Sequence, residues 1–251
     1  MDPTRRFTDR VDDYVRFRPG YPDAVLDVLA AECGLVPGAV VADVGAGTGQ
    51  LTRLLVARGC RVFAVEPNDA MRAALAKAFG RVRGVEAVEG RAEATGLPDR
   101  SVDVVTAAQA FHWFDVAGAR AEFRRILRPG GGLALVWNIR DVDASPFMRD
   151  YEELVQRFSI DLEASRRVHG KPEDVAAFFG DVTASVRRLP HAQVFDFEGL
   201  RGRLLSSSYA PAAGHPRHEA MLEALRGLYE AHAEQGRVRF AYSTEVWCAR
   251  T

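Results

Sequence analysis

Residues 40–51 read VVADVGAGTGQL, a pattern typical of a buried strand that runs through a glycine turn into a helix. Gly45, Gly47 and Gly49 stand at alternate positions, so one edge of the turn carries no Cβ atom. The backbone can therefore lie directly against a ligand, at φ values that other residues avoid. The first N–H groups of the following helix lack partners within that helix and can face such a ligand. We therefore predict a binding site at this turn.

An acidic residue follows the second apolar run. Residues 61–65 read RVFAV, and Glu66 comes next, 17 residues after Gly49. An acid at the end of the second strand of a βαβ unit is placed to accept hydrogen bonds from two ribose hydroxyls. The glycines run G-x-G-x-G rather than G-x-G-x-x-G, which disfavours a nicotinamide dinucleotide. The sequence therefore predicts a ligand that contains a nucleoside.

Strand and helix patterns alternate between residues 39 and 138. Such alternation is typical of a parallel sheet that helices cover on both faces. Residues 128–132, RPGGG, predict a turn before the fifth strand. The predicted strands are 39–44, 61–65, 84–88, 102–107 and 132–138, and the predicted helices are 48–58, 68–79 and 116–128.

The pattern is less regular after residue 138. Residues 190–198 predict a sixth strand, and residues 238–249 predict a last strand or hairpin because apolar residues alternate there. Residues 199–217 predict a loop with a short helix. The predicted helices of this part are 146–158, 172–180 and 218–233.

The bulk composition limits the class of protein. The chain has 251 residues, of which 47% are hydrophobic and 27% charged, as in soluble globular proteins. A net charge of −1 disfavours a broad nucleic-acid surface. The three cysteines form no paired motif, which favours reduced thiols over a disulfide framework or a zinc site. The chain shows no secretion signal and no apolar run of membrane-spanning length, so we expect a cytoplasmic protein without a membrane partner.

Four motifs in a fixed order resemble a known family. They are DVGAGTG at residues 43–49, VEPNDAM at 65–71, GRAEATGLPDRSVDVV at 90–105 and LRPGG at 127–131. Their order and spacing resemble the class I S-adenosylmethionine-dependent methyltransferases from about residue 36 to 140. The similarity is greatest to the small-molecule branch called methyltransferase type 11.

Two further stretches resemble a subgroup of that branch. AQAFHWFD at residues 108–115 and YVRFRPGYP at residues 14–22 are similar to stand-alone bacterial and fungal methyltransferases, among them proteins like trans-aconitate methyltransferase. The similarity continues more loosely through residues 205–209 and 242–249.

The resemblance implies an α/β fold, Rossmann-like and doubly wound, with a ligand at the carboxyl ends of the strands. It implies a seven-stranded, mostly parallel sheet whose last strand is antiparallel. We expect a helical N-terminal segment over the site at 1–35 and a cofactor-binding core at 36–140. A helical insertion at 141–185 is expected to act as a substrate lid, and residues 186–251 are expected to complete the sheet.

The resemblance also implies the cofactor, which is S-adenosylmethionine, with S-adenosylhomocysteine as the product and no metal. Many relatives have Asp where this chain has Arg91, so the contact to the adenine amino group falls to Glu93 or to the backbone at Ala92. The residues expected to hold the cofactor are Asp43, Gly45, Ala46, Gly47, Gly49, Glu66, Pro67, Met71, Ala92, Glu93, Gln109, Tyr14 and Arg18.

The acceptor side is predicted from the end of the fourth strand and from later residues. His112 can act as a general base for a hydroxyl or amine, or can merely line the wall, and the second role is favoured because methyl transfer needs little acid–base help. Arg18 can close over the cofactor, bind a substrate carboxylate or make a surface ion pair. The residues expected to contact the acceptor are His112, Trp113, Trp137, Arg140 and Tyr209.

These expectations define a reaction, an in-line displacement at a sulfonium methyl group. Such a site needs alignment and the exclusion of water more than strong catalysis. The predicted acceptor is a small molecule that is methylated on oxygen or on a carboxylate, with no nucleic-acid partner. Two alternatives stay open, namely a cofactor-binding protein of the same fold without turnover and a nicotinamide-dependent oxidoreductase. The oligomeric state is left open by the sequence.

Overall fold

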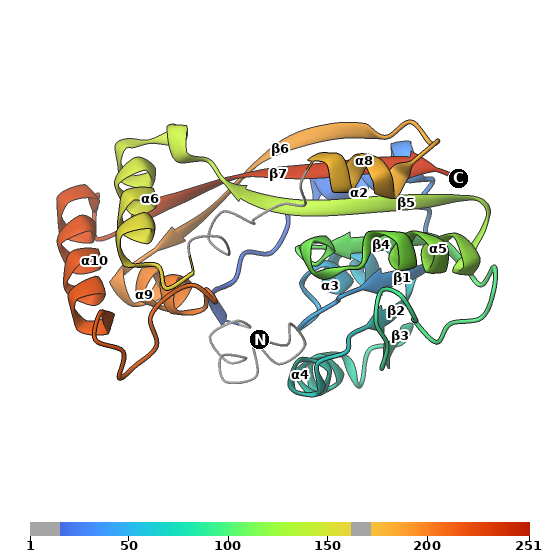
Figure 1. Cartoon of the computed structure of the whole chain (residues 1–251), viewed down its shortest axis with the longest axis horizontal. Helices are drawn as coiled ribbons and strands as arrows, with labels where there is room; N and C mark the ends of the chain where they lie inside the picture. Colours follow the sequence, from blue (N-terminus) through green and yellow to red (C-terminus); the bar gives the residue numbers. More distant parts are fainter. Residues whose placement is uncertain (1–15, 162–171) are drawn as a thin grey trace.

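The computed structural model describes residues 16–161 and 172–251, so Tyr14 lies outside the described residues. Its strands form one seven-stranded sheet in the order β3-β2-β1-β4-β5-β7-β6 (Figure 1). Strands β1 to β5 pair in parallel, and β7 runs antiparallel to both β5 and β6. The predicted fold class is confirmed. The strands are β1 Val40–Val44, β2 Arg61–Val65, β3 Val85–Val88, β4 Val102–Ala108, β5 Leu127–Arg140, β6 Ser185–Phe195 and β7 Val238–Arg250.

Helices cover both faces of the parallel part of the sheet. On one face, α2 (Ala24–Cys33) and α3 (Gln50–Ala57) pack on the sheet, and α4 (Asp69–Phe79) packs beside them over β2 and β3. On the other face, α5 (Val116–Ile126) and α8 (Pro172–Phe179) pack on β4 and β5. Because both faces are covered, the strands read as continuous apolar runs rather than as alternating ones.

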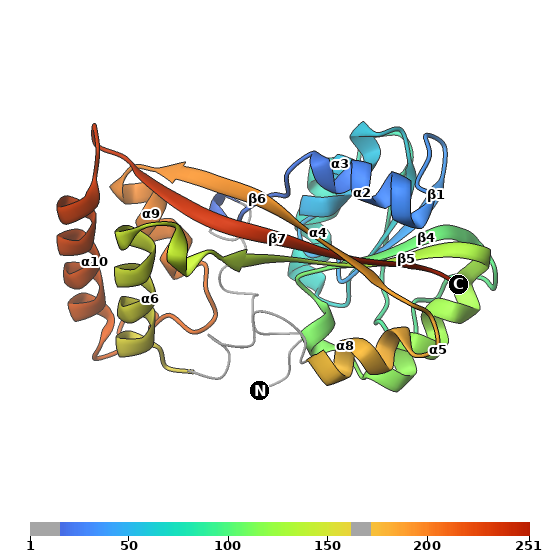
Figure 2. The ribbon, with the colours of Figure 1, turned by 90° about the horizontal axis from the view of Figure 1, so that it is seen from above.

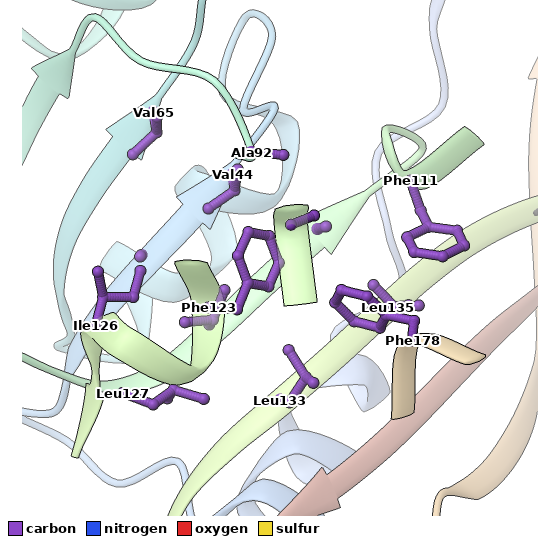
Figure 3. Close-up of a cluster of buried hydrophobic side chains, with 14 of the residues drawn as sticks. Val44, Val65, Ala92, Phe111, Phe123, Ile126, Leu127, Leu133, Leu135 and Phe178 are labelled. Atoms are coloured by element: carbon purple, nitrogen blue, oxygen red, sulfur yellow. The ribbon is translucent and has the colours of Figure 1, made fainter. Parts of the chain in front are cut away.

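The core under α5 is aromatic (Figure 3). The rings of Phe123 from α5 and Phe178 from α8 meet edge to face, with centroids 5.5 Å apart. Both lie in the same buried cluster as Leu133 and Leu135 of β5. Residues that are far apart in the sequence therefore fix α8 against the parallel sheet.

The last three strands are long and serve a second core. Beyond the parallel sheet, β5, β6 and β7 extend to a group of three helices (Figure 2), which are α6 (Pro146–Phe158), α9 (Phe197–Leu205) and α10 (His218–His232). Phe240 of β7 meets Tyr151 of α6 edge to face, with ring centroids 4.7 Å apart. The strands β5 and β7 therefore connect the two cores rigidly, a feature that the sequence patterns did not predict.

Two boundaries differ from those predicted. The strand expected at 190–198 spans Ser185–Phe195, because the Asp196 side chain accepts a hydrogen bond from the Gly199 amide and starts α9. The turn expected at 128–132 is an irregular part of β5, since the pairing register shifts between Val102 and Val104. Gly130, with φ at +75°, allows the strand to bend there without breaking.

Within the described residues, no helix is both long and apolar enough to cross a membrane. Cys33, Cys60 and Cys248 are buried as free thiols. The Cys33 Sγ–H points at the carbonyl of Leu133, 3.4 Å away, so this thiol packs α2 onto β5.

The contact between α2 and β5 yields a stability prediction. A Cβ added at Gly132 would lie 2.3 Å from the Cys33 carbonyl oxygen, so Gly132→Ala forces the backbone of β5 or α2 to move. We expect a loss of about 1–3 kcal/mol in the free energy of unfolding, the usual cost of overpacking. Urea unfolding of the full chain measures it.

Gly227, inside α10, provides the matched control. An added Cβ there meets nothing within 4 Å, so Gly227→Ala is expected to stabilise the protein by about 0.5–1 kcal/mol. Equal stabilities for Gly132→Ala and the unaltered protein would show that α2 does not pack on β5 as described.

Candidate cofactor site

A cleft lies at the carboxyl ends of β1, β2 and β4. It opens to solvent, and the volume that a water molecule can reach inside it is about 120 Å³. This is the edge at which an open α/β sheet binds its ligands. The lining residues are Gly45, Gly47, Glu66, Pro67, Asn68, Met71, Arg91, Ala92, Glu93, Ala108, Gln109, Ala110, Trp113 and Phe114.

The glycine turn is close-packed on both of its sides. Gly45, Gly47 and Gly49 have φ values of +71°, +59° and +88°, which favour glycine. A Cβ at Gly45 would lie 2.5 Å from the Ala110 Cβ, and one at Gly49 would lie 2.4 Å from the Phe79 ring. Gly45 and Gly47 line the cleft, whereas Gly49 meets the α4 helix instead.

The amides of the turn are partly used inside the protein. Gly45 and Ala46 both donate to the Val65 carbonyl, at 2.8 and 3.1 Å. Gly47 donates to Glu66 Oε2 at 2.8 Å. The glycines therefore give a ligand close access to the backbone rather than an open row of N–H donors.

Glu66 is held rigidly at the end of β2. Its Oε2 accepts from Gly47 and its Oε1 accepts from the Asn68 amide at 2.9 Å, while Arg72 donates to its backbone carbonyl. Burial raises the pKa of the Glu66 carboxyl, and the two backbone hydrogen bonds oppose that rise. A carboxylate oxygen can accept two hydrogen bonds, so each oxygen keeps capacity for a second donor. The group therefore fits two ribose hydroxyls without breaking any bond in the protein.

The residues after Glu66 form an apolar wall. Asn68 caps α4, because its Oδ1 accepts from the Met71 amide at 2.9 Å. This cap fixes Met71, which is buried and lines the cleft together with Pro67. The arrangement suits a flat heterocycle beside the ribose position.

The opposite side of the cleft is the loop at residues 91–97. Glu93 Oε1 accepts from the Asp115 amide at 2.8 Å, and Glu93 Oε2 lies 3.7 Å from Arg91 Nε. The Arg91 charge thus offsets the Glu93 charge at the rim. Ala92 is buried and offers its backbone to the cleft.

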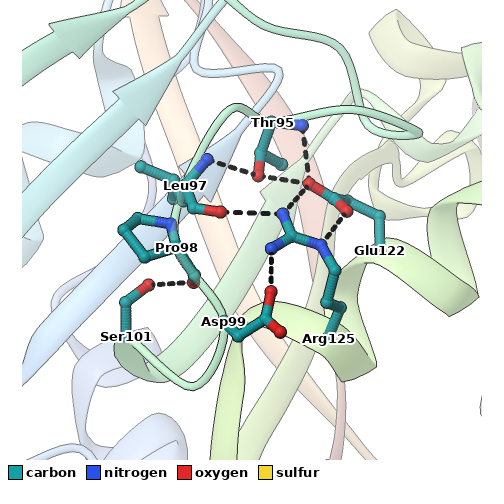
Figure 4. A network of polar contacts seen from close by, with 7 residues as sticks. All are labelled: Thr95, Leu97, Pro98, Asp99, Ser101, Glu122 and Arg125. Carbon is teal, nitrogen blue, oxygen red and sulfur yellow. Dashed lines mark hydrogen bonds and ion pairs between the residues drawn. The ribbon is translucent and has the colours of Figure 1, made fainter.

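A polar network anchors this loop to α5 (Figure 4). Glu122 Oε1 accepts from both the amide and the hydroxyl of Thr95, at 2.8 and 2.6 Å. Arg125 donates to the Leu97 carbonyl at 2.7 Å and to both oxygens of Glu122. The hydrogen bonds with Arg125 hold the pKa of Glu122 at about 2, well below its ordinary value, so the network stays charged at neutral pH.

The third wall follows β4. Gln109 has φ at +54°, a strained conformation for this residue type, of the kind that often occurs at functional sites. Its amide donates to the Val136 carbonyl and its side chain donates to the Asn138 carbonyl, both at 2.9 Å. Trp113 and Phe114 complete this wall. His112, in the 3₁₀ turn Phe111–Trp113, is not among the lining residues, and its ring lies 4.8 Å from that of Trp113.

Two other predicted residues are buried behind the cleft. Asp43 accepts from Thr52 Oγ1 at 2.7 Å and from Thr106 Oγ1 at 3.0 Å. Trp137 is only 1% exposed and meets Phe111 edge to face in the aromatic core. Both residues are therefore buried in the protein interior and do not line the cleft.

Three more predicted residues lie together outside the cleft lining. Arg140 donates to the Tyr209 hydroxyl at 2.9 Å and pairs with Glu152 at 2.8 Å. Arg18 donates to the Ser206 carbonyl at 3.0 Å. The lining residues that the sequence did not single out are Asn68, Ala108, Ala110 and Phe114. Of these, Asn68 had a signal, since Asn before Asp-Ala-Met is a good helix cap.

In the described ranges, 16–161 and 172–251, no three His, Cys, Asp or Glu side chains come together in a way that could hold a metal ion. The cleft thus brings together the glycine turn, one buried carboxylate and several apolar walls.

The buried Asp43 predicts a pH dependence of stability. Burial raises its pKa to about 6 in the folded protein, from 3.8. The folded state therefore binds the proton more tightly, and stability falls as the pH rises from about 4 through 6. Relative to Asp43→Asn, which cannot titrate, we expect the unaltered protein to lose about 1–3 kcal/mol of unfolding free energy between pH 4.5 and 7.5. Urea unfolding measures these free energies. A difference between the unaltered protein and Asp43→Asn that stays the same at every pH would contradict this.

Comparisons with known proteins agree with the fold. A family model described as a methyltransferase domain matches residues 42–135. An uncharacterized methyltransferase of Mycobacterium tuberculosis is 43% identical over 162 residues, which are 62% of this chain and 61% of that protein. An uncharacterized methyltransferase-like protein of Schizosaccharomyces pombe is 35% identical over 158 residues, 62% of this chain and 60% of that protein. The chain thus spans about three fifths of the length of these relatives.

A solved structure extends the likeness to nearly the whole chain. It comes from Anaeromyxobacter dehalogenans, is provisionally named a type II methyltransferase, and is 29% identical with a TM-score of 0.67. The match covers 93% of this chain and 98% of that one. None of these comparisons singles out the branch of proteins like trans-aconitate methyltransferase. Together they show that residues 42–135 match a methyltransferase domain and that the chain has the fold of class I S-adenosylmethionine-dependent methyltransferases.

Proposed function

We propose that this protein transfers a methyl group from S-adenosylmethionine to a small molecule. The observation that carries the proposal is the position of Glu66, a buried carboxylate that faces the glycine turn with acceptor capacity to spare. When bound, the cofactor supplies an electrophilic methyl group on a positively charged sulfur. Glu66 would hold the ribose hydroxyls, and Gly45 and Gly47 would admit the methionine part. Met71 and the loop at Ala92 and Glu93 would enclose the adenine.

The wall from Gln109 to Phe114 would surround the methyl group. Trp113 and Phe114 are large and apolar, and they would exclude water from the reacting atoms. Gln109 is fixed by two hydrogen bonds to β5, so it would hold one geometry during transfer. These residues would align the reactants, which is the main demand of an in-line displacement.

We also propose that the acceptor atom is an oxygen, and preferably that of a carboxylate. A carboxylate is already a nucleophile near neutral pH and needs no general base. Among the described lining residues there is no histidine, because Trp113 rather than His112 faces the cleft. A carboxylate acceptor therefore fits this wall better than an alcohol does.

The two alternative functions fit less well. A dinucleotide needs backbone donors for its pyrophosphate, and three amides of the glycine turn already bond to Val65 and Glu66. A binding protein without turnover would use the same cleft. Only a transfer assay distinguishes such a binding protein from an enzyme.

The role of Glu66 yields a binding prediction. Glu66→Gln keeps the size of the side chain but replaces one acceptor oxygen by an amide, and Glu66→Ala removes both. We expect Glu66→Ala to weaken S-adenosylhomocysteine binding by about 1–3 kcal/mol, the scale of hydrogen bonds to a charged group. Isothermal titration calorimetry measures this, with Glu66→Gln expected to lie between the two.

Glu89→Gln is the matched control for charge. Glu89 is 79% exposed and pairs with Arg72, the same arginine that contacts the Glu66 carbonyl, at 3.3 Å. Its substitution should leave the affinity unchanged. If folded Glu66→Ala protein bound the ligand as well as the unaltered protein, Glu66 would not hold the ribose.

A transfer assay separates the enzyme from the binding protein. Tritium-labelled S-adenosylmethionine is incubated with the protein and a small-molecule extract. We expect label in the extract that depends on the protein and falls with Glu66→Ala. Binding of the cofactor without transfer to any fraction would favour the protein without turnover.

A further inference from the structure

A second polar group lies buried where the long strands meet the helices α6 and α9. This arginine cluster consists of Arg140 on β5, Tyr151 on α6, Arg203 on α9, Tyr209 in the loop after α9, and Tyr242 on β7. Arg203 Nε donates to the Tyr242 hydroxyl at 2.8 Å, and Arg140 Nη1 donates to the Tyr209 hydroxyl at 2.9 Å. Segments distant in sequence thus meet around two guanidinium groups.

Among the described residues, the charges in the arginine cluster do not balance. Arg140 pairs with Glu152 at 2.8 Å. Arg203 is only 4% exposed, yet no carboxylate within the described residues comes within 4.0 Å of it. Its other contacts are neutral, namely the Ser207 hydroxyl at 3.1 Å and the rings of Phe240 and Tyr242. Burying a guanidinium without a counter-charge is costly, so the site favours an anion from outside.

One hydroxyl group in the arginine cluster also has no hydrogen-bond partner in residues 16–161 and 172–251. The Tyr151 hydroxyl is buried and makes no hydrogen bond within the part of the chain that the structure describes. Burial raises the pKa of Tyr151 more than the charges of Arg203 and Arg140 lower it, so it keeps its proton and remains a donor. Buried polar atoms are nearly always satisfied, and an unsatisfied one beside a surplus positive charge indicates a missing acceptor.

The pKa of Tyr209 also reflects the positive charge of the arginine cluster. Burial alone would raise its pKa, but the charges of Arg140 and Arg203 outweigh burial and hold the pKa below its ordinary value. Arg18, which donates to the Ser206 carbonyl next to this group, adds to the same effect. An anion would therefore experience attraction from several directions.

Strand β5 links the arginine cluster to the wall of the cofactor cleft. Gln109, in the wall of the cleft, donates to the carbonyl of Asn138 on β5. Arg140 comes two residues later on the same face of the strand, which places it about 6–7 Å further along. Strand β5 therefore carries both the contact to the cleft wall and Arg140 of the arginine cluster.

We propose that the arginine cluster is the acceptor subsite and binds a carboxylate or phosphate group of an anionic methyl acceptor. Arg203 supplies the charge that no described carboxylate offsets, and Arg140 and the Tyr151 hydroxyl supply further hydrogen-bond donors. The inference rests on the proposed function, because the cofactor cleft provides the methyl group that the bound acceptor meets. It restricts the acceptor to molecules that carry an anionic group away from the methylated atom.

The test uses the full chain saturated with S-adenosylhomocysteine. Succinate, inorganic phosphate and the neutral succinamide are titrated by calorimetry. We expect succinate or phosphate to bind with a dissociation constant below about 10 mM, and succinamide not to bind. The stronger of the two anions identifies the group as a carboxylate or a phosphate.

The variants Arg140→Gln and Tyr151→Phe assign the anion to this site. Arg140→Gln is expected to weaken anion binding at least tenfold, and Tyr151→Phe at least threefold. Tyr151→Phe removes a hydroxyl that has no partner among the described residues, so the thermal midpoint of this variant without anion should not fall. Arg188→Gln is the control, since Arg188 pairs with Glu245 at 2.7 Å on the same sheet but is 65% exposed.

The outcomes separate this inference from the proposed function. Failure of S-adenosylhomocysteine itself to bind would overturn the proposed function. Normal S-adenosylhomocysteine binding without binding of either anion would overturn only the subsite. Anion binding that survives both Arg140→Gln and Tyr151→Phe in folded protein would also overturn it.

Discussion

The Glu66 carboxylate joins the glycine turn after β1 to the start of α4, at the edge of the sheet where the ligand is expected. One of its oxygens holds the Gly47 amide of the glycine turn, and the other holds the Asn68 amide at the start of α4. Neither loop can move without breaking a buried, charge-assisted hydrogen bond, which is worth about 1.5–3 kcal/mol. The carboxylate is itself costly to bury, as the rise in its pKa shows. A ligand that donates two more hydrogen bonds would offset part of that cost.

The long strands place the second half of the site. Strand β5 runs from the aromatic core under α5, past the contact with Gln109, to Arg140 in the arginine cluster. The same rigid strand therefore fixes the distance between the cofactor cleft and the proposed acceptor subsite. Rigid elements give a better-defined geometry than loops do, and an in-line displacement depends on that geometry.

Much of the parallel sheet could be predicted from residues 40–138, because strands buried on both faces leave apolar runs that need no partner to be recognised. The glycine turn and Glu66 were predictable for a related reason, since their chemistry is local in the sequence. Trp137 and Trp113 show the limit of prediction from local sequence. Trp113 lies in the 3₁₀ turn after β4 and Trp137 lies within β5, and only the packing of the folded chain makes Trp113 line the cleft and Trp137 join the core.

The arginine cluster could not be predicted at all as a unit. Arg140 and Tyr209 were expected to contact the acceptor, but Tyr151, Arg203 and Tyr242 gave no signal in the sequence. Their residues come from four separate elements and a loop, brought together by antiparallel pairing and helix packing over about a hundred residues. The start of β6 was missed similarly, because Ser185–Leu189 contains two arginines that become strand residues only through pairing with β7.

A crystal structure of the protein with S-adenosylhomocysteine tests the role of Glu66 most directly. We expect both ribose hydroxyls within hydrogen-bond distance of Glu66, with its bonds to the Gly47 and Asn68 amides intact. The thioether sulfur should face Gln109 and Trp113. A ligand bound elsewhere, or a ribose that meets other residues while Glu66 only braces the glycine turn, would contradict the assignment of the cofactor site.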